Sequence, residues 1–206
     1  MGRHTQSTDA AVLRHIRRLP RGTLFTPRDL ASVGARTAVA SALSRHTRSG
    51  TITRVSRGLY QVPKRDSLLG TIKPSHDAIA KALGGRDRIK LQPSGAYAAN
   101  LLGLSNQVPL KVVYLTDGTP RRIQFGKRQI ILRRTTPRNM ATAGRVSGLV
   151  IQALRHIGRD HIDDQTITEL RRRLSRKDRA QLKRDSQLAP AWVAKIMRAI
   201  ASEDER

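Results

Sequence analysis

Residues 26–62 read TPRDLASVGARTAVASALSRHTRSGTITRVSRGLYQV, and this stretch decides the fold of the N-terminal part of the chain. Thr26-Pro27 predicts a helix start, because threonine caps helix N-termini and proline is favoured at the first helical position. Gly34 ends that helix, since glycine commonly follows the last helical residue. A longer helix is then predicted over residues 35–48.

A hairpin follows this longer helix. Residues 51–55 alternate as a strand does, Ser56-Arg57-Gly58 is a turn, and 59–62 form the returning strand, which Pro63 ends. Before residue 26, Ser7-Thr8-Asp9 predicts the start of another helix that stops at Pro20. The apolar residues of that helix recur at helical spacing: Val12, Leu13, Ile16 and Leu19. Three helices and a hairpin over residues 1–65 predict a winged helix-turn-helix domain.

Residues 66–206 predict a second domain with an α+β pattern. A short linker over 64–73 precedes a helix that Ser75 caps and Gly84-Gly85 ends. Strands are predicted near 89–91 and over 111–115, 122–125 and 129–132, with turns at Asp117-Gly118 and Gly126-Lys127. Helices are predicted over 97–102, 146–157, 167–174, 177–188 and 192–200. The fold class is therefore α+β: a winged helix followed by a basic α+β domain with a helical C-terminus.

The charge balance indicates a polyanionic partner. Lysine and arginine number 40 against 15 acidic residues, a formal charge of +25, and such an excess favours nucleic acid or an anionic membrane. A membrane is the weaker candidate, because no apolar run approaches the roughly 18 residues of a spanning helix. The polar start at residues 1–11 does not resemble a signal peptide. With no cysteine, disulfides and cysteine-bound metals are excluded, and we expect a cytoplasmic, nucleoid-associated protein.

The helix over 35–48 is the predicted DNA-reading element, because the last helix of a helix-turn-helix enters the major groove. At 100° per residue, Val39, Ala42 and Leu43 face the core, and small hydroxyl residues face away from it. Small side chains let the backbone approach base edges, and flanking arginines reach guanine or phosphate. The expected DNA-binding residues, including two at the tip of the wing, are Arg36, Thr37, Ser41, Ser44, Arg45, Arg48, Arg54 and Arg57.

Two further patterns resemble a known family. The segments ALSR at 42–45, GTITR at 50–54 and RGLY at 57–60 are similar to the winged helix of AbiEi-type antitoxins. The block PSGAYAANLLGLSNQVP at 93–109, followed by YLTDG at 114–118, resembles the central part of the same family. The matches span about residues 10–135, and the central block is the more specific of the two.

The resemblance implies a type IV toxin–antitoxin role. In that family the N-terminal domain represses its own operon, usually at inverted repeats in the promoter, and the C-terminal domain carries antitoxicity. The functional partner it implies is a nucleotidyltransferase-like toxin encoded next door, with which no stable complex is required. From the residues alone, the central block also has a structural interpretation, with Gly95 and Gly103 as helix boundaries, Asn100 as a cap and Gln107 as a loop anchor.

We expect no enzymatic activity, cofactor or metal. No acidic residue is followed two positions later by lysine, as in common metal-dependent nucleases, and Asp163-Asp164 is read as a helix start. His156 and His161 lack an acidic or cysteine partner in sequence and are read as surface residues. Gly84-Gly85-Arg86 lacks the lysine and hydroxyl of a phosphate-binding loop.

Three alternatives remain open. The charge equally fits a structural RNA-binding or ribosome-associated protein. An antitoxin that binds its toxin directly is another possibility, and some winged helices bind proteins instead of DNA.

A basic cluster over 171–184 either adds phosphate contacts or is a solvated helix face, interrupted by Asp178 and Asp185.

Overall fold

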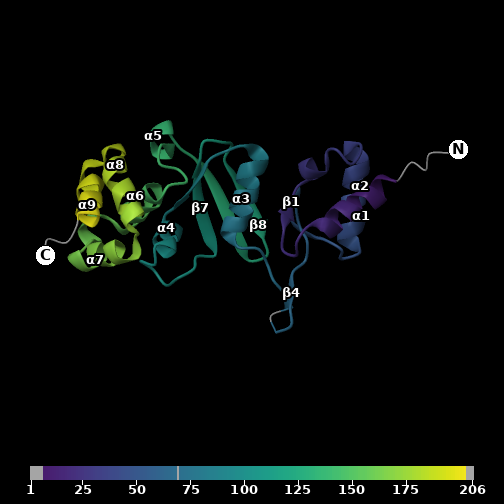
Figure 1. Ribbon diagram of the computed structural model, residues 1–206, viewed down its shortest axis with the longest axis horizontal. Helices are drawn as coiled ribbons and strands as arrows, with labels where there is room; N and C mark the ends of the chain where they lie inside the picture. Colours follow the sequence, from purple (N-terminus) through teal and green to yellow (C-terminus); the bar gives the residue numbers. More distant parts are fainter. Residues whose placement is uncertain (1–6, 69, 203–206) are drawn as a thin grey trace. The chain divides into compact units, whose positions relative to one another are not determined.

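The computed structural model describes residues 7–68 and 70–202, and Figure 1 shows their helices and strands. The chain divides into two compact units, Met1–Arg86 and Asp87–Arg206. The acidic segment 203–205 lies outside the described residues. Within them, no helix is both long and apolar enough to cross a bilayer.

The first unit contains the predicted order of helices and hairpin, with additions. Its elements are α1 (Thr8–Arg18), β1 (Leu24–Phe25), η1 (Pro27–Leu30), α2 (Arg36–Arg48), β2 (Thr53–Ser56), β3 (Leu59–Gln61), β4 (Arg65–Asp66), β5 (Gly70–Thr71) and α3 (His76–Asp87), whose last residue lies past the division.

Helix α1 begins as predicted, because the Ser7 side chain accepts a hydrogen bond from the Ala10 N–H. Such a bond satisfies one of the backbone donors left open at a helix start. Val12 and Ile16 of α1 are buried together with residues of η1, α2 and the small sheet. Burial of one apolar stripe thus fixes α1 on α2, and the two helices pack against each other.

The second predicted helix is wrong in type and length. Thr26-Pro27 does begin a helical segment, but η1 is a 3-10 helix of four residues, and the chain turns through Ala31–Gly34 before α2. The Asp29 carboxylate accepts hydrogen bonds from the Thr26 N–H and hydroxyl, which fixes this start. The short turn is what places α2 directly after η1.

The wing belongs to a three-stranded antiparallel sheet with the order β1-β3-β2. Strand β1 was not predicted, and it pairs Leu24 with Gln61 on β3. The rings of Phe25 and Tyr60 stack at 5.8 Å between centroids. The fold class is therefore confirmed as α+β, with N-terminal helices and a hairpin that are consistent with a winged helix.

The second unit combines one mixed sheet with a group of helices. Its elements are β6 (Leu91–Ser94), α4 (Ala96–Leu101), β7 (Lys111–Thr116), β8 (Arg121–Phe125), β9 (Arg128–Arg134), α5 (Pro137–Met140), α6 (Val146–Ile157), η2 (Arg159–His161), α7 (Asp164–Arg173), α8 (Arg176–Asp185), η3 (Ser186–Leu188) and α9 (Ala191–Ala201).

The sheet has the order β6-β7-β9-β8. The predicted turn at Gly126-Lys127 is confirmed, since β8 and β9 pair as antiparallel neighbours with Phe125 opposite Arg128. The predicted hairpin turn at Asp117-Gly118 is wrong, because β7 pairs with β9 in parallel and β8 lies on the far side of β9. Asp117 instead accepts a hydrogen bond from the Lys90 N–H.

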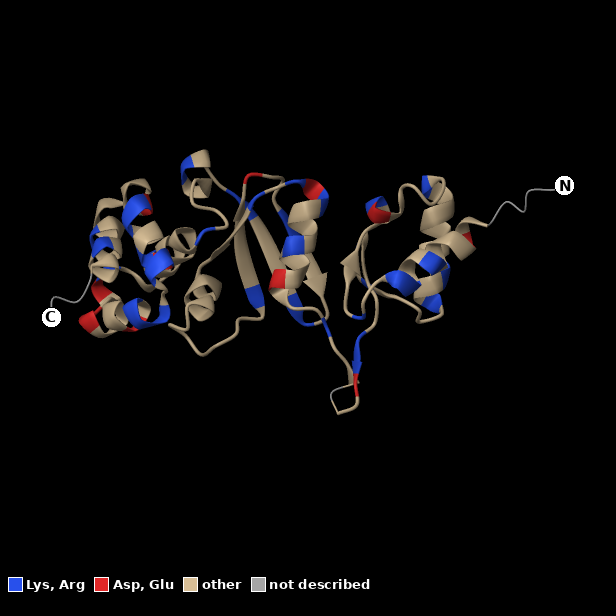
Figure 2. Cartoon of the chain, viewed as in Figure 1, with Lys and Arg blue, Asp and Glu red and all other residues tan. Residues whose placement is uncertain are grey.

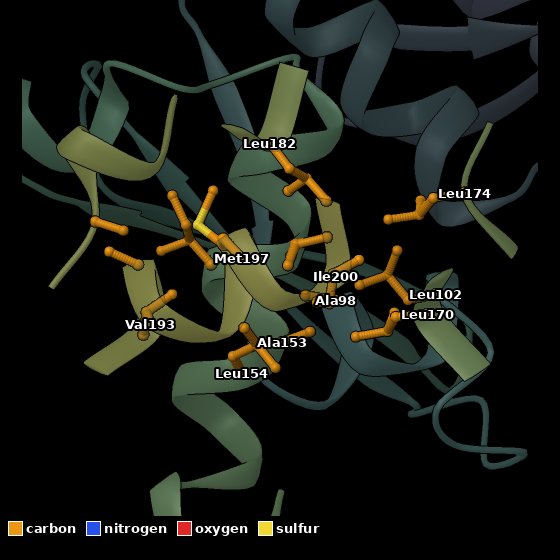
Figure 3. Close-up of a cluster of buried hydrophobic side chains, with 14 of the residues drawn as sticks. Ala98, Leu102, Ala153, Leu154, Leu170, Leu174, Leu182, Val193, Met197 and Ile200 are labelled. Carbon is orange, nitrogen blue, oxygen red and sulfur yellow. The ribbon is translucent and has the colours of Figure 1, made fainter. Parts of the chain in front are cut away.

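Five helices of the second unit share one hydrophobic core. Buried side chains of α4, α6, α7, α8 and α9 form a single cluster, and Figure 3 shows Leu154, Leu182 and Met197 within it. The predicted helix over 146–157 matches α6 at both ends. Helices α6 and α9 bury a regular apolar stripe, whereas the only apolar residues buried within α7 and α8 are Leu170 and Leu182.

Two other predictions need correction. Gly84-Gly85 does not end its helix: α3 begins after Ser75, whose hydroxyl accepts from the Ala78 N–H, and continues to Asp87. The helix ends where Arg88 takes a positive φ of 53°, the left-handed conformation common after helix ends. The predicted linker over 64–73 contains the β4–β5 hairpin.

Candidate nucleic-acid interface

Helix α2 has one buried side and one exposed side. Val39, Ala42 and Leu43 are buried as predicted, together with His46, which was not predicted. Arg36, Thr37, Ala40, Ser41, Ser44, Arg45 and Arg48 are all exposed. Their spacing along a helix of 3.6 residues per turn gathers them into one stripe. Figure 2 shows where lysine and arginine lie along the chain.

Arg45 carries a charge that the fold already balances. Its Nη2 lies 2.7 Å from Oδ1 of Asp9, a residue of α1, and its Nε donates to the same oxygen at 3.2 Å. This hydrogen bond from Arg45, helped by the nearby positive charges, holds the pKa of Asp9 below its ordinary value. The sequence did not reveal the pair, because 36 residues separate its members.

Arg48 and Ser44 lie one turn apart and contact each other. The Arg48 Nη2 donates to the Ser44 hydroxyl at 3.3 Å, which directs the guanidinium along the exposed stripe. Arg36 lies at the other end of α2 and is also exposed. The two arginines thus flank a stretch of Thr37, Ala40 and Ser41, whose short side chains leave the helix backbone accessible.

The wing places its two predicted arginines on the exposed surface. Arg54 lies in β2 opposite Tyr60, and Arg57 is in the turn between β2 and β3. Gly58 completes this turn with a φ of 71°, which a residue with a Cβ rarely adopts. The main-chain oxygen of Arg57 accepts a long hydrogen bond of 3.5 Å from Arg86 Nη1.

A cleft of about 550 Å³ lies beside the start of α2 within the first unit. It is lined by residues of η1, α2 and the wing turn, and it includes three arginines: Arg28, Arg36 and Arg86. Arg28 Nη1 donates to the Arg86 main-chain oxygen at 2.6 Å. Sequence reasoning selected Arg36 alone of the three, because the other two lie outside the helix and wing that it considered.

The acidic residues of the winged helix are both engaged. Residues 1–65 contain two acids, Asp9 and Asp29; the first pairs with Arg45 and the second accepts from Thr26. Helix α2 itself contains no acidic residue. The stripe on α2 therefore carries positive charge and hydroxyl groups, a combination suited to phosphates and base edges.

The central block of residues 93–109 forms structure around α4. Gly95 precedes α4 and Gly103 follows its end, as predicted. Asn100 is not a cap, because its Nδ2 donates to the Ser105 main-chain oxygen and ties the following loop to the helix. The Gln107 N–H donates to the Ser105 hydroxyl, while its side chain is exposed.

Asp163 lies at a helix start, and His156 and His161 lie on the surface, as the sequence predicted. Asp163 caps α7, where its carboxylate accepts from the N–H and hydroxyl of Thr166, and these bonds lower its pKa. His156 and His161 are exposed. Over 7–68 and 70–202, no three histidine, aspartate or glutamate side chains gather as a metal site would require.

Comparisons with known proteins identify a family and solved structures with a similar fold. No curated protein matches the chain. The crystal structure of the RV2827C protein from Mycobacterium tuberculosis has a TM-score of 0.46 and 14% identity, over 98% of this chain and 84% of that one. A family model described as "Family of unknown function (DUF6088)" matches residues 11–182. Because that match covers most of this chain, the chain belongs to the DUF6088 family.

Proposed function

We propose that this chain is a DNA-binding antitoxin of a type IV toxin–antitoxin system that represses its own operon. The observation that carries the proposal is the exposed side of α2, which joins arginines to small hydroxyl residues and contains no acid. The basic wing beside it adds Arg54 and Arg57. The antitoxin assignment is supported by the resemblance of residues 93–109 and 114–118 to AbiEi-type antitoxins.

In the proposed mechanism, α2 enters the major groove of the promoter. Thr37, Ser41 and Ser44 are short enough for the helix to lie close to base edges, where hydroxyl groups donate or accept hydrogen bonds. Arg36 and Arg48 reach guanine or phosphate from either end of the stripe. The wing arginines contact the neighbouring backbone, and the bound protein blocks RNA polymerase from the promoter.

A single charge on the reading face tests this mechanism. Ser41→Glu places a carboxylate on the exposed side of α2, where phosphate and base acceptors repel it. We expect loss of binding to a duplex that carries the chain's own promoter, measured by fluorescence anisotropy, with an unchanged circular dichroism spectrum. Gln107→Glu makes the same charge change on an exposed loop of the second unit and should leave binding intact.

Three outcomes would overturn the assignment. Sequence-specific binding by a folded Ser41→Glu variant would remove α2 from the mechanism. Tighter binding to structured RNA than to the promoter at matched salt would make the chain an RNA-binding protein. For the antitoxin role, coexpression with a neighbouring nucleotidyltransferase-like gene should relieve toxicity; failure of relief would refute it, and copurification of the two proteins would indicate direct binding.

A further inference from the structure

Two arginines of the basic cluster over 171–184 have internal partners in the structure. Arg171 Nη2 donates to the Ala199 main-chain oxygen at 2.7 Å, which joins α7 to α9. Arg173 forms an ion pair with Glu169, one turn earlier on α7. These two arginines therefore serve the packing and charge balance of their own helix group. The remaining cations of the cluster need another explanation.

The two acids that interrupt the cluster are both held by internal partners. Asp178 accepts hydrogen bonds from the N–H and hydroxyl of Ser175, at the start of α8. Asp185 is only 5% exposed and accepts from Ser147, Gln181 and Arg145. Asp185 is buried and Asp178 is partly buried, and their helical spacing puts both on the side of α8 that faces away from residues 176, 180 and 184. The two acids therefore interrupt the basic cluster in the sequence but not on the opposite, exposed side of this helix.

The outer side of α8 is a continuous basic stripe. Residues 176, 177, 180, 183 and 184 are exposed, and their spacing puts them on one side of the helix, opposite the fully buried Leu182. Four are cations: Arg176, Lys177, Lys183 and Arg184. Within the described part of the chain none of these four forms an ion pair, and Arg184 donates to the neutral Gln181. Figure 2 shows the lysine and arginine of α8 in blue and the acidic start of α7 in red.

The chemistry of the stripe selects the kind of partner. Four cations on a helix of ten residues, about 15 Å long at 1.5 Å per residue, match a surface of closely spaced negative charges such as duplex DNA. A helix that lies in a membrane surface needs a wide apolar face toward the lipid, whereas the outermost uncharged residue here is Ala180. Alanine is small, and it lets the helix come close to a phosphate backbone.

We propose that the exposed side of α8 is a second DNA-binding surface, which holds phosphates without reading sequence. The inference rests on the proposed function, because it assigns a DNA contact to the second unit of a DNA-binding protein. The two helices would then have different tasks. Helix α2 has hydroxyl groups for base edges and one arginine already paired with Asp9. The stripe on α8 has no hydroxyl group, and its four cations form no ion pair with any residue in 7–68 or 70–202.

The test uses the full chain with all four charges removed: Arg176→Gln, Lys177→Gln, Lys183→Gln and Arg184→Gln. Dissociation constants are measured between 50 and 200 mM NaCl on the promoter duplex and on a scrambled duplex of equal length. Four lost phosphate contacts should reduce the slope of log K against log salt by about 3.6, at roughly 0.9 per contact. The ratio of affinities for the two duplexes should stay unchanged, because phosphate contacts carry no sequence information.

A matched control removes the same charge elsewhere on the second unit. Lys111→Gln, Lys127→Gln, Arg133→Gln and Arg134→Gln replace four exposed cations of the mixed sheet, and the slope should fall by less than about 1. If the slope of log K against log salt falls equally in both variants, or does not fall in the α8 variant, the inference is overturned. A wild-type chain that shows no preference for its promoter overturns the proposed function instead, while the scrambled duplex still reports on α8. Thermal unfolding of both variants verifies that they are folded.

Discussion

Asp9 limits how much of the charge of Arg45 is available to a ligand. Its carboxylate receives both the Nη2 and the Nε of that arginine, and its lowered pKa means that it remains ionised at any pH near neutrality. His46 lies on the inner side of the same helix, with Nε2 at 3.5 Å from the same Asp9 oxygen. One acidic residue of α1 thus sets the net charge of the C-terminal half of α2.

Removal of this acid should strengthen DNA binding. Asp9→Asn releases Arg45, which then gains one phosphate contact, and we expect the salt slope on the promoter duplex to rise by about 0.9. The double variant Asp9→Asn with Arg45→Gln should return to the wild-type slope. An unchanged slope in the single variant would show that Arg45 does not reach the DNA even when it is unpaired.

Gly148 marks a close approach between α6 and its surroundings. A Cβ at this position would collide with the Thr142 main-chain oxygen and the Gln92 side chain, and a main-chain atom cannot move aside cheaply. Gly148→Ala should therefore lower the free energy of unfolding by about 1–3 kcal/mol, as overpacked sites do. Urea denaturation followed by circular dichroism measures this change.

Gly85 supplies the opposite control for that measurement. It lies inside α3 with open space where a Cβ would be added. Gly85→Ala should raise stability by about 0.5–1 kcal/mol, because alanine loses less backbone entropy in a helix. If both substitutions destabilised the protein equally, close packing at Gly148 would not be the reason.

At the scale of elements, Asp185 joins the start of α6 to the end of α8. Ser147 of α6 and Arg145, the residue before α6, donate hydrogen bonds to the Asp185 carboxylate, and Gln181 donates to it from α8 itself. Burial raises the pKa of Asp185, but the hydrogen bonds from Ser147 and Gln181 and the positive charge of Arg145 outweigh it, so the pKa lies below its ordinary value. The ionised form therefore stabilises the contact between the two helices.

This network predicts a pH-dependent loss of stability. Because the pKa of Asp185 is lower in the folded state, its contribution is fully present above the ordinary pKa and is lost as pH falls through the lowered one. Asp185→Asn should lower the free energy of unfolding by about 1–3 kcal/mol at pH 7. In urea denaturation at pH 3 the difference between variant and wild type should shrink; a difference that stays constant with pH would contradict the role of ionisation.

Several elements could be predicted because local signals agreed with tertiary packing. Residues 146–157 have a regular apolar stripe, and α6 buries that stripe in the core. The prediction that Gly84-Gly85 ends its helix was wrong, because each glycine weakens a helix by only about 1 kcal/mol and the packing of α3 overrides this cost. The predicted hairpin at Asp117-Gly118 was wrong because a turn sequence does not reveal which strand β7 pairs with.

The candidate residues of α2 could be predicted from its periodicity. Arg28, Arg86 and the pair of Asp9 with Arg45 could not, because they depend on long-range contacts.

For the whole molecule, the formal charge of +25 predicts strongly salt-dependent DNA binding. If about six phosphates are neutralised, affinity should fall about 10³-fold between 50 and 200 mM salt. Anisotropy titrations of the full chain across this range measure the slope. Affinity that changes less than about tenfold would mean that only about two phosphates or fewer are neutralised, and it would contradict the prediction.

The parallel pairing of β7 with β9 has a consequence during translation. Strand β7 is synthesised before its parallel partner β9, and β8, which follows β7 in the chain, pairs with β9 and not with β7. A nascent chain that has emerged only as far as residue 120 therefore presents one bare edge of β7. Until β9 arrives, that edge is open to other growing chains, and a ribosome-bound chaperone would be of most use to this protein in that interval.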